Sequence, residues 1–399
     1  MTDKPQFVGQ KVKLSDICSI VSGATPKTTV KDYWGGDIKW ITPSELNDDS
    51  HVIYNTAKHL TEAGFASARL RMFPEGTVLL TTRAPIGKVA IAGEPMCCNQ
   101  GFKNLVCSDA VNNEYLYRYL KNRSSELQVL GRGATFKELS KKEVAAYEIN
   151  LPPLKRQLEA VEKLALVDKQ VVIAKTQLDK LDSLVKSRFV EMFGDPIRNP
   201  LRMSVSSVEE LAAPIKNSMK AGPFGSALKK EVYAESGYKV YGQEQVISGD
   251  QFLGNYYIDK EKYEQLNSCK VMPGDVLISL VGTVGKVLIL SEDCQPGIIN
   301  PRLVKITFDK RKIFPEYFAI AFSLESVRSS LLGKAHGQTM NVLNLGMIKK
   351  LKLPVPPISR QKEYLNFVAQ ADKSRFVAQQ QIEKLQMLYD SLAQEYFGD

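Results

Sequence analysis

Two long stretches of the chain repeat the same pattern of hydrophobic and polar positions. The first covers residues 151–195 and the second covers residues 355–399. Subtracting 204 from the second numbering makes several pairs coincide: Pro356 with Pro152, Gln361 with Gln157, Leu385 with Leu181, Phe397 with Phe193 and Gly398 with Gly194. A repeat of this length indicates that the chain is built from two related halves.

Within both stretches the apolar residues recur at heptad spacing, with charged residues between them. This spacing is typical of a coiled-coil seam, although a core helix of a bundle shows the same stripe. A proline pair precedes each stretch and a glycine stands near each end, where helix starts and C-caps favour them. We therefore expect two helices, each roughly 60 Å long. The expected seam residues are Leu164, Val167, Val171, Ala174, Leu178, Leu181, Val185, Val368, Ala371, Ala378, Ile382, Leu385, Tyr389 and Leu392, with Arg375 as an exception.

The remaining chain alternates short β-type runs with turns. In the first half we expect strands at residues 38–41, 78–82 and 88–92, and a helix from Glu114 to Leu130. Residues from about 200 to 354 repeat this plan, because Gly274–Ser279 falls on Gly76–Thr81 when 198 is subtracted. The framework positions agree between the halves, whereas the loop positions differ.

These patterns predict an α+β chain with two similar α/β domains separated by two long helices. An internal pseudo-two-fold repeat would make the helices an antiparallel coiled coil. The expected boundaries are residues 1–154 for the first domain, 155–198 for the first helix, 199–357 for the second domain and 358–399 for the second helix.

Composition limits the class of protein. The chain is 44% hydrophobic and 24% charged, with a net charge of +9, which favours an anionic partner. No apolar run approaches the roughly 20 residues that cross a bilayer, and the first residues lack a secretory signal, so we expect a cytoplasmic protein without membrane contact. The six cysteines form no C-x-x-C pair and there are only three histidines, so we expect no metal site.

Motifs for intrinsic catalysis are not supported. Residues 282–287, GTVGKV, lack the spacing of a Walker A loop and the hydroxyl residue after the lysine. No G-x-G-x-x-G follows an expected strand, and neither G-x-S-x-G nor H-E-x-x-H occurs. Neither proline pair directly follows Asn or Asp, as an amino-methyltransferase loop would require. We therefore expect a chain without an enzyme activity or a cofactor of its own.

Several motifs in a fixed order resemble one known family. They are SGATP at residues 22–26, WGGDIKW at residues 34–40, GPFGSAL at residues 222–228, two Gly-Lys-Val segments, Arg-Gln after each proline pair, and Phe-Gly-Asp at both helix ends. Over nearly its full length the chain resembles the specificity subunit of Type I restriction–modification systems. The resemblance implies two target-recognition domains that each read one half of a bipartite, asymmetric double-stranded DNA target. It also implies that the helices are spacers, and that catalysis belongs to two adenine methyltransferase (modification) subunits and to restriction subunits that translocate and cut DNA.

Loop residues that suit DNA are candidates for contact, since Arg and Lys pair with guanine, Asn and Gln with adenine, and cations and hydroxyls with phosphate. An exposed side chain without a partner is the alternative for each. The candidates are Thr25, Lys27, Lys31, Arg83, Lys88, Gln100, Lys103, Arg132 and Lys137 in the first domain, and Ser226, Lys229, Lys230, Gln243, Lys286, Asn300, Arg302, Lys334, His336, Gln338 and Asn341 in the second.

Three alternatives stay open at this point. The chain could be the specificity subunit of a Type IIB-like system, in which one partner fuses methylation and cleavage. It could be a coiled-coil adaptor that binds proteins and no DNA, although the basic loops speak against this. It could also be a stand-alone enzyme, which the motif search disfavours.

Overall fold

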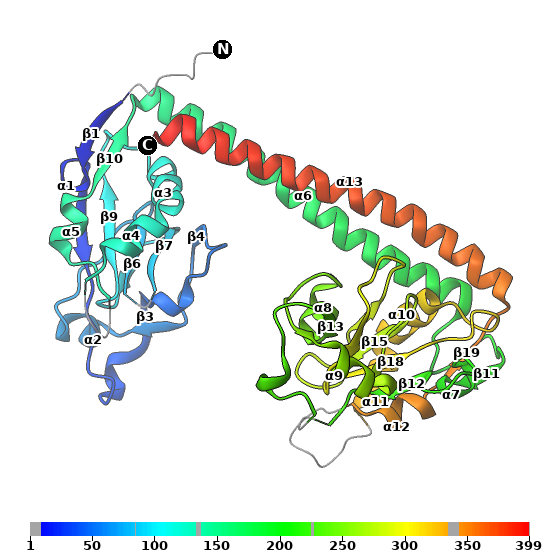
Figure 1. Cartoon of the computed structure of the whole chain (residues 1–399). Coiled ribbons are helices and arrows are strands. Elements are labelled where there is room, and N and C mark those ends of the chain that lie inside the picture. The colour runs from blue at the N-terminus through cyan, green and yellow to red at the C-terminus, as the bar shows by residue number, and fades with distance from the viewer. Residues whose placement is uncertain (1–8, 84, 133–136, 225–226, 334–342, 399) are drawn as a thin grey trace. The chain divides into compact units, whose positions relative to one another are not determined.

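The computed structural model describes residues 9–83, 85–132, 137–224, 227–333 and 343–398 (Figure 1). The chain divides into two compact units. Unit 1 comprises Met1–Lys175 and Gln380–Asp399, and unit 2 comprises Thr176–Gln379. Each unit therefore contains the N-terminal half of one long helix and the C-terminal half of the other.

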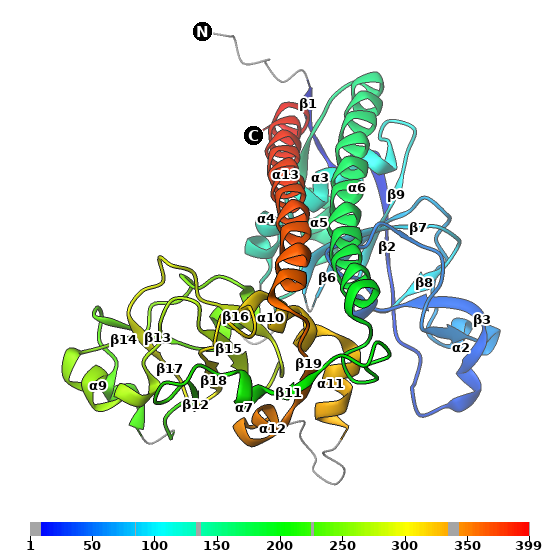
Figure 2. The ribbon, with the colours of Figure 1, turned by 90° about the vertical axis from the view of Figure 1, so that its right-hand side faces the viewer.

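The two long helices are α6 (Leu154–Phe193) and α13 (Ile358–Phe397), with 40 residues each. Figures 1 and 2 show them side by side with opposite chain directions, which confirms the antiparallel coiled coil. In unit 1 the α6 residue Leu164 and the α13 residue Ala393 belong to one core, and in unit 2 Val185 and Ala371 do. All fourteen expected seam residues are buried or half-buried, and so is Arg375, whose guanidinium pairs with Asp182 at 2.7 Å.

The helix ends follow the sequence signals. α6 begins directly after Pro152 and Pro153, and α13 begins directly after the corresponding proline pair. Gly194 and Gly398 follow the two helices with φ of 73° and 64°, the left-handed conformation that a C-cap glycine adopts at little cost.

The described residues of unit 1 form three sheets. β1 (Gln10–Lys13) pairs with β10 (Glu148–Leu151). The five-stranded sheet has the order β2 (Cys18–Ser22), β9 (Lys103–Cys107), β6 (Val78–Thr82), β7 (Ile86–Ala92), β4 (Val52–Ile53). The three-stranded sheet has the order β5 (Lys58–Leu60), β3 (Trp34–Ile41), β8 (Cys97–Cys98), and β3 is parallel to β8. The short helices are α1 (Leu14–Ile17), α2 (Glu62–Ser67), α3 (Asn113–Asn122), α4 (Ser124–Leu130), α5 (Lys141–Ala146), η1 (Lys31–Tyr33) and η2 (Pro43–Glu45).

Among the described residues, unit 2 repeats this topology except for strand β4. β11 (Val205–Ser207) pairs with β19 (Lys352–Pro354), and the larger sheet has the order β12 (Met219–Ala221), β18 (Leu303–Ile306), β15 (Val276–Ser279), β16 (Val287–Ile289). The three-stranded sheet has the order β14 (Tyr257–Ile258), β13 (Tyr238–Tyr241), β17 (Gly297–Ile299), and β13 is parallel to β17. The short helices are α7 (Val208–Leu211), α8 (Gln243–Ser248), α9 (Lys260–Gln265), α10 (Pro315–Ser323), α11 (Glu325–Leu332), α12 (Leu345–Lys350), η4 (Lys230–Val232) and η5 (Asn267–Cys269).

The predicted strands are present, although two of them begin earlier, at Trp34 and Ile86. The helix predicted from Glu114 to Leu130 is wrong as a single element, because α3 ends at Asn122 and α4 begins at Ser124. Arg123 between them has φ −95° and ψ 15°, outside helical geometry. Both helices contact strand β7.

A buried glutamine fastens the start of each long helix to its unit. Gln157 accepts a hydrogen bond from the Asn112 backbone N–H (2.8 Å) and donates to the carbonyls of Ala110 (3.1 Å) and Pro152 (2.9 Å). In unit 2 the counterpart Gln361 accepts from the Phe314 N–H (2.9 Å) and donates to the carbonyls of Lys312 (3.0 Å) and Pro356 (2.8 Å). The same loop before α3 or α10 is thus bonded to each helix start.

The C-terminal ends of the helices dock at a second repeated position. Phe397, at the end of α13, packs against Tyr115 with ring centroids 5.5 Å apart. Phe193, at the end of α6, packs against Tyr317 with centroids 5.1 Å apart. Tyr115 and Tyr317 hold equivalent positions in α3 and α10, so both units receive a helix end in the same way.

The seam can be tested with two leucines of one helix. Leu164 is fully buried, whereas Leu166 is 60% exposed. We expect Leu164→Ala to lower the free energy of unfolding by about 2–5 kcal/mol, because it leaves a cavity. Leu166→Ala should change it by less than about 0.5 kcal/mol. Guanidinium unfolding of both variants measures the difference, and equal midpoints would contradict the assigned seam.

Candidate nucleic-acid interface

A repeated hydroxyl shapes one loop in each unit. In unit 1 Thr81 donates to the carbonyl of Pro85 (2.7 Å) and accepts from the N–H of Lys88 (2.9 Å). In unit 2 Ser279 donates to the carbonyl of Thr283 (2.6 Å) and accepts from the N–H of Lys286 (3.0 Å). In each unit, therefore, one buried hydroxyl oxygen bonds to two backbone groups of the turn that follows β6 or β15.

A second repeated element supports the segment after β3 and β13. Lys39 donates to the carbonyl of Tyr54 (2.7 Å), and Lys239 donates to the carbonyls of Phe252 (2.9 Å) and Gly254 (3.0 Å). Lys239 is almost fully buried, and this burial lowers its pKa. The two lysines hold long loops against equivalent strands.

The third repeated element is an asparagine turn. Asn99 Oδ1 accepts from the Gly101 N–H (2.9 Å), and Asn300 Oδ1 accepts from the Arg302 N–H (2.9 Å). The strand registers show that these turns are equivalent. Ser22 pairs with Lys103 in unit 1 and Ala221 pairs with Val304 in unit 2, and each asparagine lies equally far before the paired residue of its own segment. One backbone geometry thus presents glycine in unit 1 and arginine in unit 2.

Three of the predicted DNA contacts meet in unit 2. Gln243, Asn300 and Arg302 line a cleft of about 510 Å³, together with Leu228, Tyr233, Val240, Glu244 and Tyr256. The Arg302 guanidinium donates to Gln243 Oε1 (3.4 Å), and Gln243 Nε2 donates to the carbonyl of Val281. Within the described ranges no carboxylate lies at ion-pair distance from Arg302, so its charge is available to a ligand.

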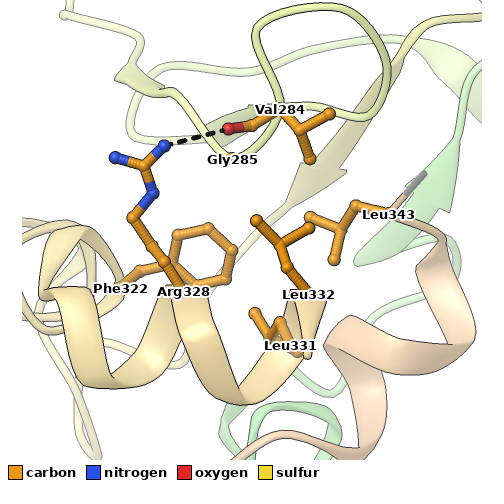
Figure 3. A pocket seen from close by; sticks show the side chains of 7 residues that line it. All are labelled: Val284, Gly285, Phe322, Arg328, Leu331, Leu332 and Leu343. Atoms are coloured by element: carbon orange, nitrogen blue, oxygen red, sulfur yellow. Dashed lines mark hydrogen bonds between the residues drawn. The ribbon is translucent and has the colours of Figure 1, made fainter. Parts of the chain in front are cut away.

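A neighbouring turn carries Lys286, which is exposed. Gly282 and Gly285 in this turn have φ of 67° and 75°, which favours glycine at both positions. Arg328 of α11 supports the turn from below, since its Nη2 donates to the carbonyl of Val284 (3.4 Å; Figure 3). Phe322 of α10 and the leucines drawn in Figure 3 line a small apolar pocket between this turn and α11.

In unit 1 two of the predicted DNA contacts, Arg83 and Lys103, lie close to the carboxylate of Glu138. Thr25 donates to Gln100 Oε1 (2.5 Å), and the Lys103 ammonium donates to the Gln100 carbonyl (3.4 Å). Glu138 lies 3.9 Å from that ammonium and 3.4 Å from the Arg83 guanidinium. Lys103 is mostly buried, and desolvation lowers its pKa. It therefore offers less surface to a phosphate than the sequence suggests.

The other predicted contacts fall into three groups. Arg132 pairs with Glu143 (3.1 Å), and Lys88 donates to the carbonyl of Leu46 (2.9 Å). Four lysines are exposed: Lys27, Lys31, Lys137 and Lys229. The others lie outside the described residues: Ser226, Lys334, His336, Gln338, Asn341 and the side chain of Lys230.

Sequence reasoning missed Glu138 and Glu244, because an acidic residue in a loop gives no signal for DNA contact. It also missed Tyr233 and Tyr256, whose rings are 5.3 Å apart beside the unit 2 cleft. A second open cleft of about 480 Å³ lies in unit 1 between Trp34 and His59. No local pattern identifies these groups, since tertiary contacts assemble them.

Other kinds of site find little support. The part of the chain that the structure describes contains no group of three or more His, Cys, Asp or Glu side chains arranged to hold a metal ion. The six cysteines are free thiols. None of the described helices is both long and apolar enough to span a bilayer.

A family model supplies the identification. Residues 9–183 and 223–387 match the model of the Type I restriction modification DNA specificity domain, once in each half. These matches cover most of the chain, which therefore belongs to this family.

Individual specificity subunits are also similar to this chain in sequence. The specificity subunit of the Type I restriction enzyme MjaIX from Methanocaldococcus jannaschii is 38% identical over 192 residues, covering 47% of this chain and 44% of that subunit. This match spans less than half of the relative's length. The MjaVIII specificity subunit of the same organism is 20% identical over 88% of this chain and 83% of its own length, and the Escherichia coli EcoBI specificity subunit is 23% identical over 69% and 62%.

Two solved structures share the fold. The S subunit of a Type I restriction–modification system from M. genitalium aligns with a TM-score of 0.52 at 13% identity, covering 100% of this chain and 98% of its own. A chain from a structural study of assembly and conformational transition in the type I R-M system aligns with a TM-score of 0.63 at 16% identity, covering 98% of both.

The repeated hydroxyl offers a test within one framework. We expect Ser279→Ala to lower the free energy of unfolding by about 1–3 kcal/mol, because the Lys286 N–H and the Thr283 carbonyl lose their hydrogen-bond partner, the buried Ser279 hydroxyl. The Lys286 amide should then exchange its hydrogen faster. Ser279→Thr is the matched control, since unit 1 uses threonine at this position, and it should behave like the parent chain. Hydrogen exchange of all three proteins checks this, and unchanged exchange in the alanine variant would contradict it.

Proposed function

We propose that this chain is the sequence-specific DNA-binding subunit of a Type I restriction–modification complex. Each unit reads one half of a bipartite, asymmetric target. The recognition domains are residues 1–154 and 199–357, and residues 155–198 and 358–399 are the helical spacers between them. Family membership supports this assignment, together with two copies of one framework that present different side chains.

The observation that carries the proposal is the contrast between equivalent turns. Unit 1 has Pro43 and Gly101 where unit 2 has Gln243 and Arg302. The half-buried Asn99 and Asn300 form the same backbone hydrogen bond in the two units. A guanidinium pairs with the O6 and N7 of guanine, and a glutamine amide pairs with the N6 and N7 of adenine. The two units therefore suit different bases, which makes the target asymmetric.

The long helices account for the gap between the half-sites. Each runs for 40 residues without interruption, and its start is bonded to one unit through a buried glutamine. A stiff connection makes the distance between two DNA-reading domains a property of the protein, so the number of unread base pairs between the half-sites should be constant.

The outer faces of the helices are suited to partner subunits. In unit 1 Leu166, Val172 and Met387 are 60–64% exposed, and in unit 2 Phe376 and Val377 are 64% and 62% exposed. Apolar side chains in such numbers on helix surfaces favour a covering protein. We propose that two methyltransferase subunits dock here, one in each half, and that these and the restriction/translocase subunits carry all the catalysis, which takes place on DNA in the cytoplasm.

Mapping methylated bases across the genome of cells with and without this chain tests the proposal directly. We expect a bipartite motif whose methylation depends on the chain. Arg302→Ala should relax one half-site only and weaken binding of the assembled complex by roughly 10- to 100-fold, since one good base contact is worth about 1–3 kcal/mol. Arg311→Ala is the matched control, because this arginine is exposed at the opposite end of β18 and pairs with Asp309 at 2.9 Å. Equal loss on every sequence would assign Arg302 to phosphate contact.

Salt dependence tests the electrostatic part. Binding of the assembled complex to its target should weaken steeply as salt rises, because each neutralised phosphate releases a counterion. Titrations between about 50 and 200 mM salt measure the slope. A flat dependence would rule out a phosphate-based interface.

The partner stoichiometry is a separate prediction. Native mass measurement of the complex at saturating methyltransferase should give two copies per chain, because both halves present the same fold. A saturated complex with a single copy would contradict docking on both halves.

A further inference from the structure

One aromatic side chain in unit 2 is exposed to an unusual degree. Phe224 is 90% exposed, the highest value among the large hydrophobic side chains of the described residues. A phenylalanine in this state gains almost none of the free energy that burial would provide. A single exposed hydrophobic residue is ordinary, so the case depends on where this ring lies and how it is held.

The backbone on both sides of Phe224 is fastened. The Gly222 N–H donates to the Leu303 carbonyl (2.9 Å), and a Cβ at Gly222 would lie only 1.8 Å from the Asn300 carbonyl oxygen. After Phe224, the N–H of Ala227 donates back to the Phe224 carbonyl (2.8 Å). The backbone that leads to the ring is therefore held against the Asn300 turn through Gly222.

This position is at the rim of the unit 2 cleft. Gly222 contacts Asn300, and Leu228 lines the cleft together with Asn300 and Arg302. The cleft is lined by Gln243, Asn300 and Arg302 and also by apolar side chains such as Leu228 and Tyr256. Lys229 is exposed directly after Leu228. An exposed ring beside groups that suit base edges and phosphates is typical of proteins that stack on bases or open a base step.

Unit 1 differs at the equivalent position. There the strand register places Thr25 where unit 2 has Phe224, and a Cβ at Gly23 would lie 2.3 Å from the Asn99 carbonyl oxygen, much as one at Gly222 would meet the Asn300 carbonyl. The Thr25 hydroxyl is bonded to Gln100, so it presents a polar group and no wedge. Any effect of the ring should therefore be confined to the half-site that unit 2 reads.

From this geometry we propose that Phe224 inserts its ring into the DNA of that half-site, where it stacks on a base and partly opens one base step. The inference rests on the proposed DNA-binding function and deepens it. The free-energy cost of unstacking would be offset by the stacking contact of the ring, which is 90% exposed in the free protein.

The test uses the complete chain assembled with its methyltransferase, without S-adenosylmethionine, on a duplex of the mapped target. 2-Aminopurine replaces single bases in turn through both half-sites, and its fluorescence rises where a base loses its stacking. We expect one position in the unit 2 half-site to respond. Phe224→Ala should abolish this response and weaken binding roughly tenfold. Phe224→Trp should retain both, because tryptophan also stacks.

Ile215→Ala is the matched control, since Ile215 is 49% exposed and precedes β12, whereas Phe224 follows it. It should leave affinity and fluorescence unchanged, and all variants should melt at the temperature of the parent chain. Parental affinity and an unchanged fluorescence profile in Phe224→Ala would overturn the inference while leaving the proposed function intact. Failure of the parent complex to bind the mapped target would overturn the proposed function and the inference with it.

Discussion

A buried glutamine amide at the start of each long helix ties that helix to the loop before α3 or α10. Gln157 and Gln361 each use one acceptor and two donor bonds inside the protein. An unpaired amide in these positions would cost the full desolvation of its polar groups, so the helix direction at its start is strongly specified. The far end of each helix is seated by a phenylalanine on a buried tyrosine. Two fastened ends make each helix a structural part of both units.

The framework and the candidate reading surface use largely different side chains, and Asn300 belongs to both. Thr81 and Ser279, and Lys39 and Lys239, bond to backbone groups within each unit, and Asn99 and Asn300 each accept from a backbone N–H of their own turn. The side chains that face outward on the same turns are under no such constraint. Because the backbone geometry does not depend on them, they can differ freely between units. This separation lets one fold present two different surfaces, as the proposed reading of two unrelated half-sites requires, and the contrast between Thr25 and Phe224 is a further instance.

The sequence predicted which types of side chain the candidate DNA-binding site would use, but only part of the residues it named lie together in the structure. Gln243, Asn300 and Arg302 were chosen for their chemistry and do lie in one cleft. Lys88 and Lys103 were chosen for the same reason, yet one bonds to a backbone carbonyl and the other is mostly buried. Charge in a loop indicates a partner of opposite sign, but it does not indicate whether that partner is DNA or an acid such as Glu138. Only the distances between side chains decide this.

The sequence by itself determined the repeat, the heptad seam, the helix ends and the antiparallel pairing, because these follow from periodicity and from the backbone preferences of proline and glycine. The tertiary structure decided the interruption of the α3–α4 helix at Arg123 and the parallel pairing of β3 with β8 and of β13 with β17. It also decided which loop residues meet in the unit 2 cleft. These features depend on contacts between residues far apart in the chain, and a local pattern of hydrophobic and polar positions carries no record of such contacts.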